Sequence, residues 1–265
     1  MNTIYIQKYP ESKEPNGDII IGEIASVDCY VAYEGALKMG DKVIFFEDER
    51  EVPLSPTESF KIPLMVSSIE ETIAYLERAG IEIPKPLSIP EELKSFVQRH
   101  YEIKTLEEFK KETELPIFVK PHSKLKTFPS GVIKNESSRR LLFGSINGKE
   151  IDQTQMVLVS EVVDMISEFR VFILRGEILD IQHYQGDPLV FPEALIIRAA
   201  IDEYKSAPVA YTLDFAVVKK NDYFNNPRFE TVLIEANDAW AIGSYGMEGK
   251  NYLRMLKARW YEITR

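Results

Sequence analysis

The first third of the chain alternates short apolar runs with helical patterns. Three of the apolar runs predict strands: Thr3–Gln7, Lys42–Phe46 and Pro63–Val66. Apolar residues at helical spacing predict a helix over Ser26–Met39. A second helix is predicted to begin at Ser68, where the Ser68 hydroxyl and the Glu71 carboxylate form a reciprocal cap. Strands that alternate with helices indicate a small parallel α/β unit.

A proline-rich segment follows this unit. Three prolines lie close together: Pro84, Pro86 and Pro90. Such a segment suits an extended crossing between two domains, and we expect a boundary near residue 88. Two helices are predicted next, one from Ser88 through about His100 and one from Thr105 to about Glu112. The second has the spacing of a capping box between Thr105 and Glu108.

Beyond Leu115 the pattern changes to extended runs. Seven runs predict strands: Ile117–Lys120, Ser130–Lys134, Met156–Val163, Glu168–Leu174, Glu177–Tyr184, Ala210–Val218 and Thr231–Ala236. One helix interrupts them at Pro192–Tyr204, and another is predicted near the end at Tyr252–Trp260. Many strands with few helices indicate an α+β fold with a largely antiparallel sheet.

Composition narrows the class of protein. The 265 residues are 45% hydrophobic and 28% charged, which excludes a disordered chain, a collagen or a small disulfide scaffold. The net charge of -10 argues against a sequence-independent grip on nucleic acid. The single cysteine, Cys29, fits a reducing compartment. With no apolar run of membrane-helix length and no signal-peptide pattern, we expect a soluble cytoplasmic protein without a membrane partner, acting in the host cytoplasm if phage-encoded.

The sharpest candidate chemistry lies near the C-terminus. Glu235 and Asn237 are two apart at the end of a predicted strand, so they point to the same face. If that strand forms a hairpin with the preceding one, Asp214 pairs with Glu235, and Asn225-Asn226-Pro227 forms the turn. Two carboxylates and an amide oxygen are hard ligands that suit Mg²⁺ holding phosphate oxygens. The alternative is that Glu235 and Asn237 only cap a loop at the end of the strand, and that the Asp214 carboxylate is hydrogen-bonded within the sheet.

A second candidate region begins at Lys120, which ends an apolar strand before Pro121. Pro121 is expected to stop the strand ladder. The loop His122–Val132 then offers Ser, Lys and Gly, the residue types that a flexible phosphate cover needs. The alternative is a surface hairpin with solvated lysines.

A third region combines a strand with two charges. Main-chain groups of Val157–Val163 suit an adenine edge, Glu168 suits ribose hydroxyls, and Arg170 suits a bidentate phosphate or carboxylate. Glu168 and Arg170 share one face of their strand, so the alternative is an exposed salt pair between them.

Taken together, these regions resemble the ATP-grasp superfamily over about residues 90–265. The motifs that carry the resemblance are a Lys before Pro, a glycine-bearing loop, Glu161-Val162-Val163, Glu168 seven positions later, Asp214 in a D-F-A-V strand, and Glu235-x-Asn237. The chain most closely resembles the small phage and bacterial ATP-grasp proteins of the R-two-K clade.

This resemblance implies an α+β fold in which two α+β subdomains grip ATP. Residues 1–88 resemble the small α/β pre-ATP-grasp domain that usually precedes the fold. Residues 89–265 are then the ATP-grasp domain, with a lid subdomain at about 105–160 and a C-terminal metal-binding subdomain at about 161–265.

The resemblance also implies roles for individual residues. One group contacts the phosphates: Lys120, Lys126, Ser130 and Gly131. A second group binds adenosine: Glu161, Val162, Val163 and Glu168. A third group holds Mg²⁺: Asp214, Glu235 and Asn237. Catalytic charge stabilisation falls to Lys126 and Arg170.

Two departures from the family pattern affect phosphate binding. Many members have an arginine where this chain has Thr212, and Arg170 or Arg198 is expected to supply that charge. The earlier phosphate-contacting lysine is not clear, since Lys94 and Arg99 both qualify.

The implied activity is that of an ADP-forming ligase that uses ATP and Mg²⁺ to join a carboxylate to an amine or thiol through an acylphosphate. The substrates are small molecules, peptides or a protein, and the acceptor site is expected beside the segment Asp238–Gly246, where Trp240 and Tyr245 either shape it or serve as packing aromatics. The alternatives are a kinase of the same fold and a nucleotide-binding interaction module without turnover.

Overall fold

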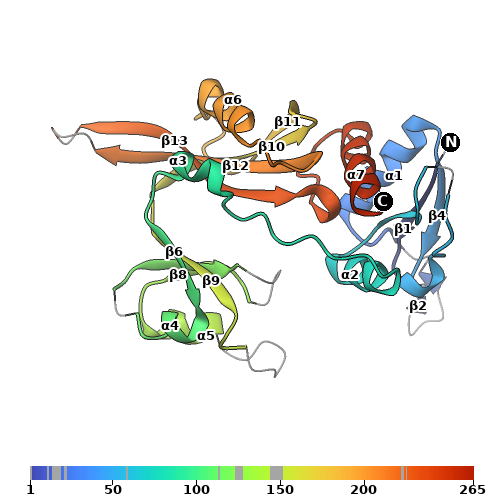
Figure 1. Ribbon diagram of the computed structural model, residues 1–265, viewed down its shortest axis with the longest axis horizontal. Coiled ribbons are helices and arrows are strands. Elements are labelled where there is room, and N and C mark those ends of the chain that lie inside the picture. The colour runs from blue at the N-terminus through green and yellow to red at the C-terminus, as the bar shows by residue number, and fades with distance from the viewer. Residues whose placement is uncertain are drawn as a thin grey trace.

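A computed structural model of the chain describes residues 2–10, 12–13, 19–20, 23–57, 59–112, 114–122, 128–143, 152–221, 224 and 226–265. Figure 1 shows an N-terminal α/β part, a long central sheet and a separate sheet below it. A short hairpin, β2 (Ser12–Lys13) with β3 (Ile19–Ile20), also belongs to the N-terminal part.

The N-terminal part contains a three-stranded parallel sheet in the order β4-β1-β5, which confirms the predicted α/β unit. Its strands are β1 (Thr3–Gln7), β4 (Lys42–Phe46) and β5 (Leu64–Val66). The helices are α1 (Val27–Met39), α2 (Ile69–Arg78) and a 3₁₀ turn, η1 (Glu49–Glu51). Ser68 caps α2 as predicted, but the reciprocal half of the cap is wrong. The Glu71 carboxylate accepts from the backbone N–H of Glu49 instead, because the two elements are packed together.

The central sheet, here the β12 sheet, is antiparallel with the order β11-β10-β12-β13. Its strands are β10 (Met165–Leu174), β11 (Glu177–Gly186), β12 (Ala210–Asn221) and β13 (Pro227–Asp238). On one face, α6 (Ala194–Glu203) buries Ile197 and Ala200 against Val171, Leu213 and Leu233. The predicted strands and the helix between them are therefore confirmed, with small changes at their ends.

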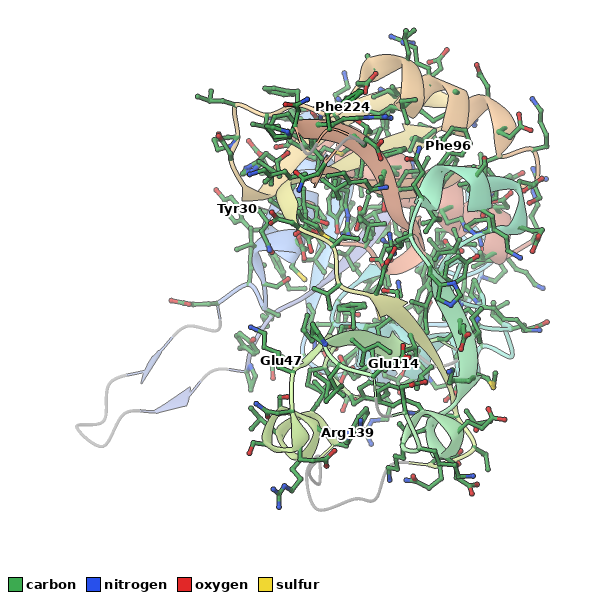
Figure 2. All side chains as sticks on the ribbon, turned by 90° about the vertical axis from the view of Figure 1, so that its left-hand side faces the viewer. Tyr30, Glu47, Phe96, Glu114, Arg139 and Phe224 are labelled. Carbon is green, nitrogen blue, oxygen red and sulfur yellow. The ribbon has the colours of Figure 1, made fainter. Side chains whose placement is uncertain are left out.

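The separate sheet, here the β9 sheet, has the order β6-β9-β7-β8. Its strands are β6 (Tyr101–Thr105), β7 (Ile117–Pro121), β8 (Gly131–Ile133) and β9 (Met156–Glu161). Two helices cover it: α4 (Leu106–Phe109) and α5 (Glu136–Phe143). Figure 2 shows Arg139, on α5, and Phe224, between β12 and β13, at opposite ends of the view.

The β9 sheet holds most of the differences from the predicted elements. Strand β6 and helix α5 were not predicted. The helix predicted through His100 is shorter, with η2 (Glu91–Leu93) and α3 (Lys94–Val97), because the next residue, Gln98, has a left-handed φ of 49°. Thr105 and Glu108 do form their capping box, but α4 ends at Phe109. Pro121 does not stop the ladder and pairs with Val157 inside the sheet.

The C-terminal helix α7 (Gly249–Ile263) packs on α1, so the beginning and end of the chain share one core. The two helices approach very closely at paired glycines. A Cβ on Gly35 would lie 2.1 Å from the Gly249 carbonyl oxygen. The boundary near residue 88 and the subdomain limits stay predictions. Every helix in the described residues is too short or too polar to cross a lipid bilayer.

Candidate functional site

The predicted hairpin of β12 and β13 has the expected register at the site. Asp214 lies opposite Glu235, as predicted. A bulge follows Asp214, so Phe215 pairs with Leu233 rather than with the next residue in line. Pro227 belongs to β13 and not to the turn, and Asn225 lies outside the described residues.

The three predicted metal-ligand side chains converge. Asn237 Nδ2 donates to Glu235 Oε1 at 3.0 Å and to Asp214 Oδ2 at 3.3 Å. The Asn237 amide therefore lies within hydrogen-bond distance of both carboxylates. Because oxygen and nitrogen of an amide are exchanged by a rotation of its end group, Asn237 can present Oδ1 at the same place.

Arg170 holds the Asp214 carboxylate from the neighbouring strand β10. Arg170 Nε donates to Oδ1 at 2.8 Å and Nη2 donates to Oδ2 at 2.7 Å. Both side chains are buried, Arg170 at 7% and Asp214 at 2% exposure. The alternative of an exposed salt pair between Glu168 and Arg170 is thus wrong. The Arg170 guanidinium also lies over the ring of Tyr245, 4.3 Å from its centroid.

The two carboxylates have opposite pKa shifts. Burial raises the pKa of Asp214 to about 6, against the opposing effect of the Arg170 guanidinium. Burial also acts to raise the pKa of Glu235, but the Lys120 ammonium and the Asn237 amide overcome it and hold that pKa below its usual value. A cation bound between the Asp214 and Glu235 carboxylates would favour the charged form of both side chains.

The donor set fits Mg²⁺. Two carboxylates and an amide oxygen are hard ligands, and Mg²⁺ in proteins commonly takes one or two carboxylates and completes its shell with phosphates and water. Within the residues that the structure describes, no cluster of three or more His, Cys, Asp or Glu side chains is arranged as a metal site. With two carboxylates and one amide oxygen, Asp214, Glu235 and Asn237 would hold Mg²⁺ together with phosphate and water ligands.

Lys120 joins the two four-stranded sheets at this point. It lies in β7, and its Nζ forms an ion pair with Glu235 Oε2 on β13. Ser130 and Gly131 follow at the start of β8, and Ser130 lines the cavity described below. Lys126, the other predicted phosphate contact, lies outside the described residues.

Three of the predicted adenosine residues, Glu161, Val162 and Val163, lie at or just after the end of β9, and Glu168 lies on β10. The Glu161 carboxylate accepts from the backbone N–H of His100 at 2.9 Å. Val162 is 42% exposed, and Val163 packs against the β12 sheet. Glu168 accepts from the Tyr184 hydroxyl at 3.0 Å, and burial raises the pKa of Glu168. Glu161 and Val162 are thus exposed, but the Glu161 carboxylate, like that of Glu168, already has a hydrogen-bond partner.

The three alternative phosphate-binding cations, Arg99, Lys94 and Arg198, have different surroundings. Arg99 donates to the carbonyls of Leu233 and Ile234, at 2.9 and 3.0 Å, directly behind the site on β13. Lys94 instead forms an exposed ion pair with Glu91. Arg198 is exposed on α6, in a small hollow that it shares with acidic residues.

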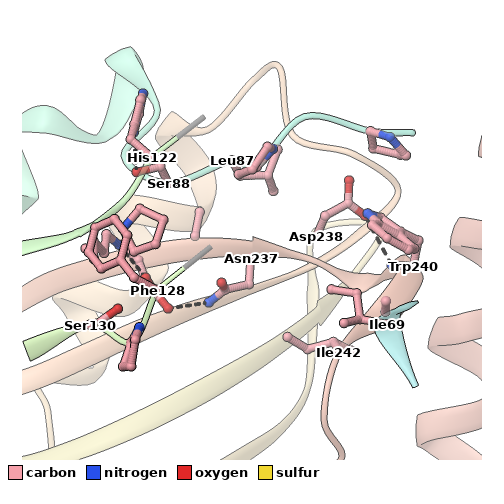
Figure 3. A pocket seen from close by; sticks show the side chains of 18 residues that line it. Ile69, Leu87, Ser88, His122, Phe128, Ser130, Asn237, Asp238, Trp240 and Ile242 are labelled. Atoms are coloured by element: carbon pink, nitrogen blue, oxygen red, sulfur yellow. Dashed lines mark hydrogen bonds and ion pairs between the residues drawn. The ribbon is translucent and has the colours of Figure 1, made fainter. Parts of the chain in front are cut away.

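A cavity of about 570 Å³ opens from Lys120, Glu235 and Asn237. Figure 3 shows its polar end at Ser88 and His122, where His122 Nδ1 lies 3.2 Å from Ser88 Oγ. Toward the other end Figure 3 shows Ile69, Trp240 and Ile242, with Asp238 beside Trp240. The linker residues Pro84, Pro86 and Leu87 also line the cavity. The cavity lies beside the segment where the acceptor site was expected.

Ser88 was not foreseen as part of the site, because its position before Pro90 resembles a helix start. It has a left-handed φ of 53°, and its carbonyl accepts from the Ala236 N–H at 2.7 Å. This bond fixes the proline-rich linker on the edge of β13, between Glu235 and Asn237. The left-handed serine is the structural signal, but no sequence pattern shows it.

Comparison with known families decides the assignment. The sequence matches the family described as ATP-grasp domain, R-two-K clade family 2, over residues 96–255. The chain belongs to this ATP-grasp family. The predicted ATP-grasp resemblance, the fold class and the cofactors, ATP and Mg²⁺, are confirmed by this assignment.

Solved structures of other ATP-grasp proteins share the fold at low sequence identity. N5-carboxyaminoimidazole synthetase from Staphylococcus aureus is 13% identical, with a TM-score of 0.55, over 97% of this chain and 77% of that one. D-alanine–D-alanine ligase from Helicobacter pylori is 15% identical, with a TM-score of 0.53, over 98% of both chains. The Bacillus anthracis D-alanine–D-alanine ligase, solved with ATP, is 12% identical, with a TM-score of 0.51, over 99% and 98%. No curated protein matches the sequence.

Proposed function

We propose that this ATP-grasp protein is an ADP-forming ligase that joins a carboxylate to an amine or thiol through an acylphosphate. The observation that carries the proposal is the cluster of Asp214, Glu235 and Asn237, which is flanked by Lys120 and Arg170 and opens into a cavity with an apolar end. A carboxylate is a poor electrophile, and transfer of a phosphoryl group gives it a good leaving group. Charge neutralisation and positioning supply most of the catalysis in such a transfer.

The roles proposed for the residues follow from their positions. Asp214, Glu235 and Asn237 hold Mg²⁺, which when bound neutralises phosphate charge. Lys120 reaches the same point from β7 and is suited to an α-phosphate oxygen. Arg170 is committed to Asp214, so it supports phosphate transfer by keeping that carboxylate charged and in place.

Nucleotide contacts of the remaining groups are proposed on the same basis. Ser130 and Gly131, together with Lys126, cover the phosphates. Three hinge residues and one carboxylate bind adenosine: Glu161, Val162, Val163 and Glu168. The domain limits implied by the family are proposed with them, so that the β9 sheet closes on ATP from one side.

The cavity favours a ligase over a phosphatase-like or purely binding role. Beyond Asn237 its wall is made of Trp240, Ile242 and linker residues, which suits an organic acceptor rather than water alone. The acidic group at this end, Asp238, is already bound by Arg259 through two contacts of 2.7 and 2.6 Å. A kinase of the same fold would use the same cluster and is separated from a ligase by its product.

The test is to measure ADP release and coupled product with ATP, Mg²⁺ and panels of carboxylates and amines. A ligase releases ADP in stoichiometric amount only when both partners are present, whereas a kinase needs one acceptor and leaves it phosphorylated. Glu235→Gln should lower turnover at least 100-fold while the protein stays folded. Glu230→Gln is the matched control, because it neutralises another glutamate of β13 outside the cluster. Wild-type turnover in Glu235→Gln would refute the metal assignment.

A further inference from the structure

A second hollow, of about 650 Å³, lies away from the nucleotide cavity and shares no lining residue with it. It is formed by the second half of α7, the turn between β10 and β11, Val209 just before β12, and Asn2, Ser59 and Phe60 of the N-terminal part. Val209, in its wall, lies just before β12 and five residues from Asp214, which corresponds to roughly 17 Å at the usual rise of a strand. The volume is in the range of small-molecule sites.

The hollow gathers positive charge on a chain whose net charge is -10. Four cations line it: Arg175, Arg254, Lys257 and Arg265. Lys257 forms an ion pair with Asp41. Within the described residues the three arginines have no acidic partner, unlike Arg78, Arg170 and Arg259 elsewhere in the chain.

The acid in the wall does not neutralise these arginines. Glu262 accepts from Arg259 Nη1 at 2.6 Å and from the Val209 N–H at 3.0 Å. Two of the arginines are held by neutral groups instead. Arg254 Nη1 donates to Asn251 Oδ1 at 3.1 Å, and the Arg265 guanidinium lies 4.3 Å from the centre of the Tyr261 ring. These contacts orient the guanidinium groups and leave their charge available.

The third arginine stands at an unfavourable position in the backbone. Arg175 and Gly176 form the two-residue turn between β10 and β11, with φ of 55° and 78°. Such turns favour Asn or Gly at both positions, because a larger side chain is strained at positive φ. The turn is fixed by the Arg175 N–H, which donates to the Val209 carbonyl at 2.8 Å. An arginine kept at a strained position on the rim of the hollow indicates a role for its guanidinium.

We propose that this hollow binds a small molecule that carries phosphate groups, at a site separate from that of ATP. Guanidinium groups bind phosphate oxygens in pairs, and three arginines line this one hollow: Arg175 in the β10–β11 turn, Arg254 on α7 and Arg265 after α7. Tyr261 and the buried Phe60 give the hollow an aromatic and apolar part that suits the organic portion of a phosphate ester. Like-charged side chains that face one hollow repel one another, and a bound anion relieves that repulsion.

The test is calorimetric titration of the full-length protein with inorganic pyrophosphate at low ionic strength. Arg254→Glu and Arg175→Glu should each weaken binding about tenfold or more. Arg198→Glu is the matched control, because Arg198 is also exposed and without an acidic partner in the described residues but lies on α6. Lys120→Ala removes a proposed phosphate contact of the nucleotide site and should leave pyrophosphate binding at the hollow unchanged.

Each outcome decides the proposal. It is overturned if wild-type protein does not bind pyrophosphate, if only Lys120→Ala loses binding, or if Arg198→Glu weakens binding as much as Arg254→Glu. Citrate serves as a carboxylate probe, and equal binding of citrate would refute specificity for phosphate. Thermal unfolding midpoints measured without pyrophosphate check that each variant is folded, and loss of one arginine without an acidic partner should not lower the midpoint. Arg254→Gln should weaken pyrophosphate binding as Arg254→Glu does.

Discussion

The β12 sheet and the β9 sheet both supply charged groups to the site, but they hold these groups in different ways. In the β12 sheet, Arg170 and Asp214 pair between adjacent strands, with side-chain exposures of 8% and 3%. Between the sheets, Lys120 pairs with Glu235, with exposures of 12% and 26%. One pair is part of a core, and the other joins two separately packed sheets.

This difference in exposure indicates which ion pair supports the fold and which one a ligand can replace. A buried pair is costly to break, because removal of one partner leaves the other charge buried without compensation. The pair between the sheets is more open, and in the roles proposed here Lys120 turns to phosphate and Glu235 to Mg²⁺. Binding of ATP would therefore replace the Lys120–Glu235 contact while the Arg170–Asp214 contact stays.

The largest effect is expected from Asp214→Ala. The change leaves the Arg170 guanidinium buried without its partner, which should lower the free energy of unfolding by about 3–5 kcal/mol and remove turnover. Urea unfolding and ADP release measure the two effects. The double variant Arg170→Met with Asp214→Leu should recover most of the stability but none of the activity. If Asp214→Ala were as stable as wild type, the two ion pairs would not differ as described.

Lys120→Met should separate activity from stability. Loss of the proposed phosphate contact is expected to weaken ATP binding at least tenfold. The free energy of unfolding should fall by less than in Asp214→Ala, because the Glu235 side chain keeps 26% exposure and its contact with the Asn237 amide. Nucleotide titration and urea unfolding on the same preparation give both values. A loss of stability as large as that of Asp214→Ala would show that this pair also belongs to the core.

Tyr245→Leu should have a smaller effect within the β12 sheet. It removes the ring that lies 4.3 Å from the buried Arg170 guanidinium, which should cost about 1 kcal/mol of unfolding free energy. Tyr261→Leu is the matched control, since Tyr261 lies at the same 4.3 Å from Arg265, which is exposed. Equal losses in the two variants would mean that burial of the cation does not matter.

The smallest effect concerns pH. Burial raises the pKa of Glu168 from its usual 4.5, so the native state binds its proton more tightly than the unfolded state does. The stability of the wild type, relative to Glu168→Gln, should therefore fall as the pH rises from 4.5 through the raised pKa. Urea unfolding at several pH values tests this. Parallel curves for the two proteins would contradict it.

The sequence allowed the core of the site to be predicted because it depends on local rules. Alternation places Glu235 and Asn237 on one face, and a short polar connection sets Asp214 opposite Glu235. The bulge after Asp214 did not disturb this, since it lies beyond the paired carboxylates.

Contacts between distant segments could not be predicted in this way. Nothing near Lys120 in the sequence indicates Glu235 as its partner, and nothing near Ser88 indicates its bond to Ala236. The Glu71 carboxylate has the spacing of a cap, but tertiary packing offers it the Glu49 N–H instead. The short strand β6 was missed because its pairing with β9, rather than its own residue pattern, holds it in place.

The close packing of α1 on α7 limits how the molecule can be divided. The family match ends at residue 255, in the middle of α7, whereas the helix continues to Ile263 and fills the N-terminal core with Trp260. A fragment trimmed to the matched segment would lose both α1 and the last turns of α7, and would expose Leu253 to water. If the N-terminal parts of two related proteins were exchanged, the protein should fold only if α1 and α7 were exchanged together, because Gly35 and Gly249 form their contact.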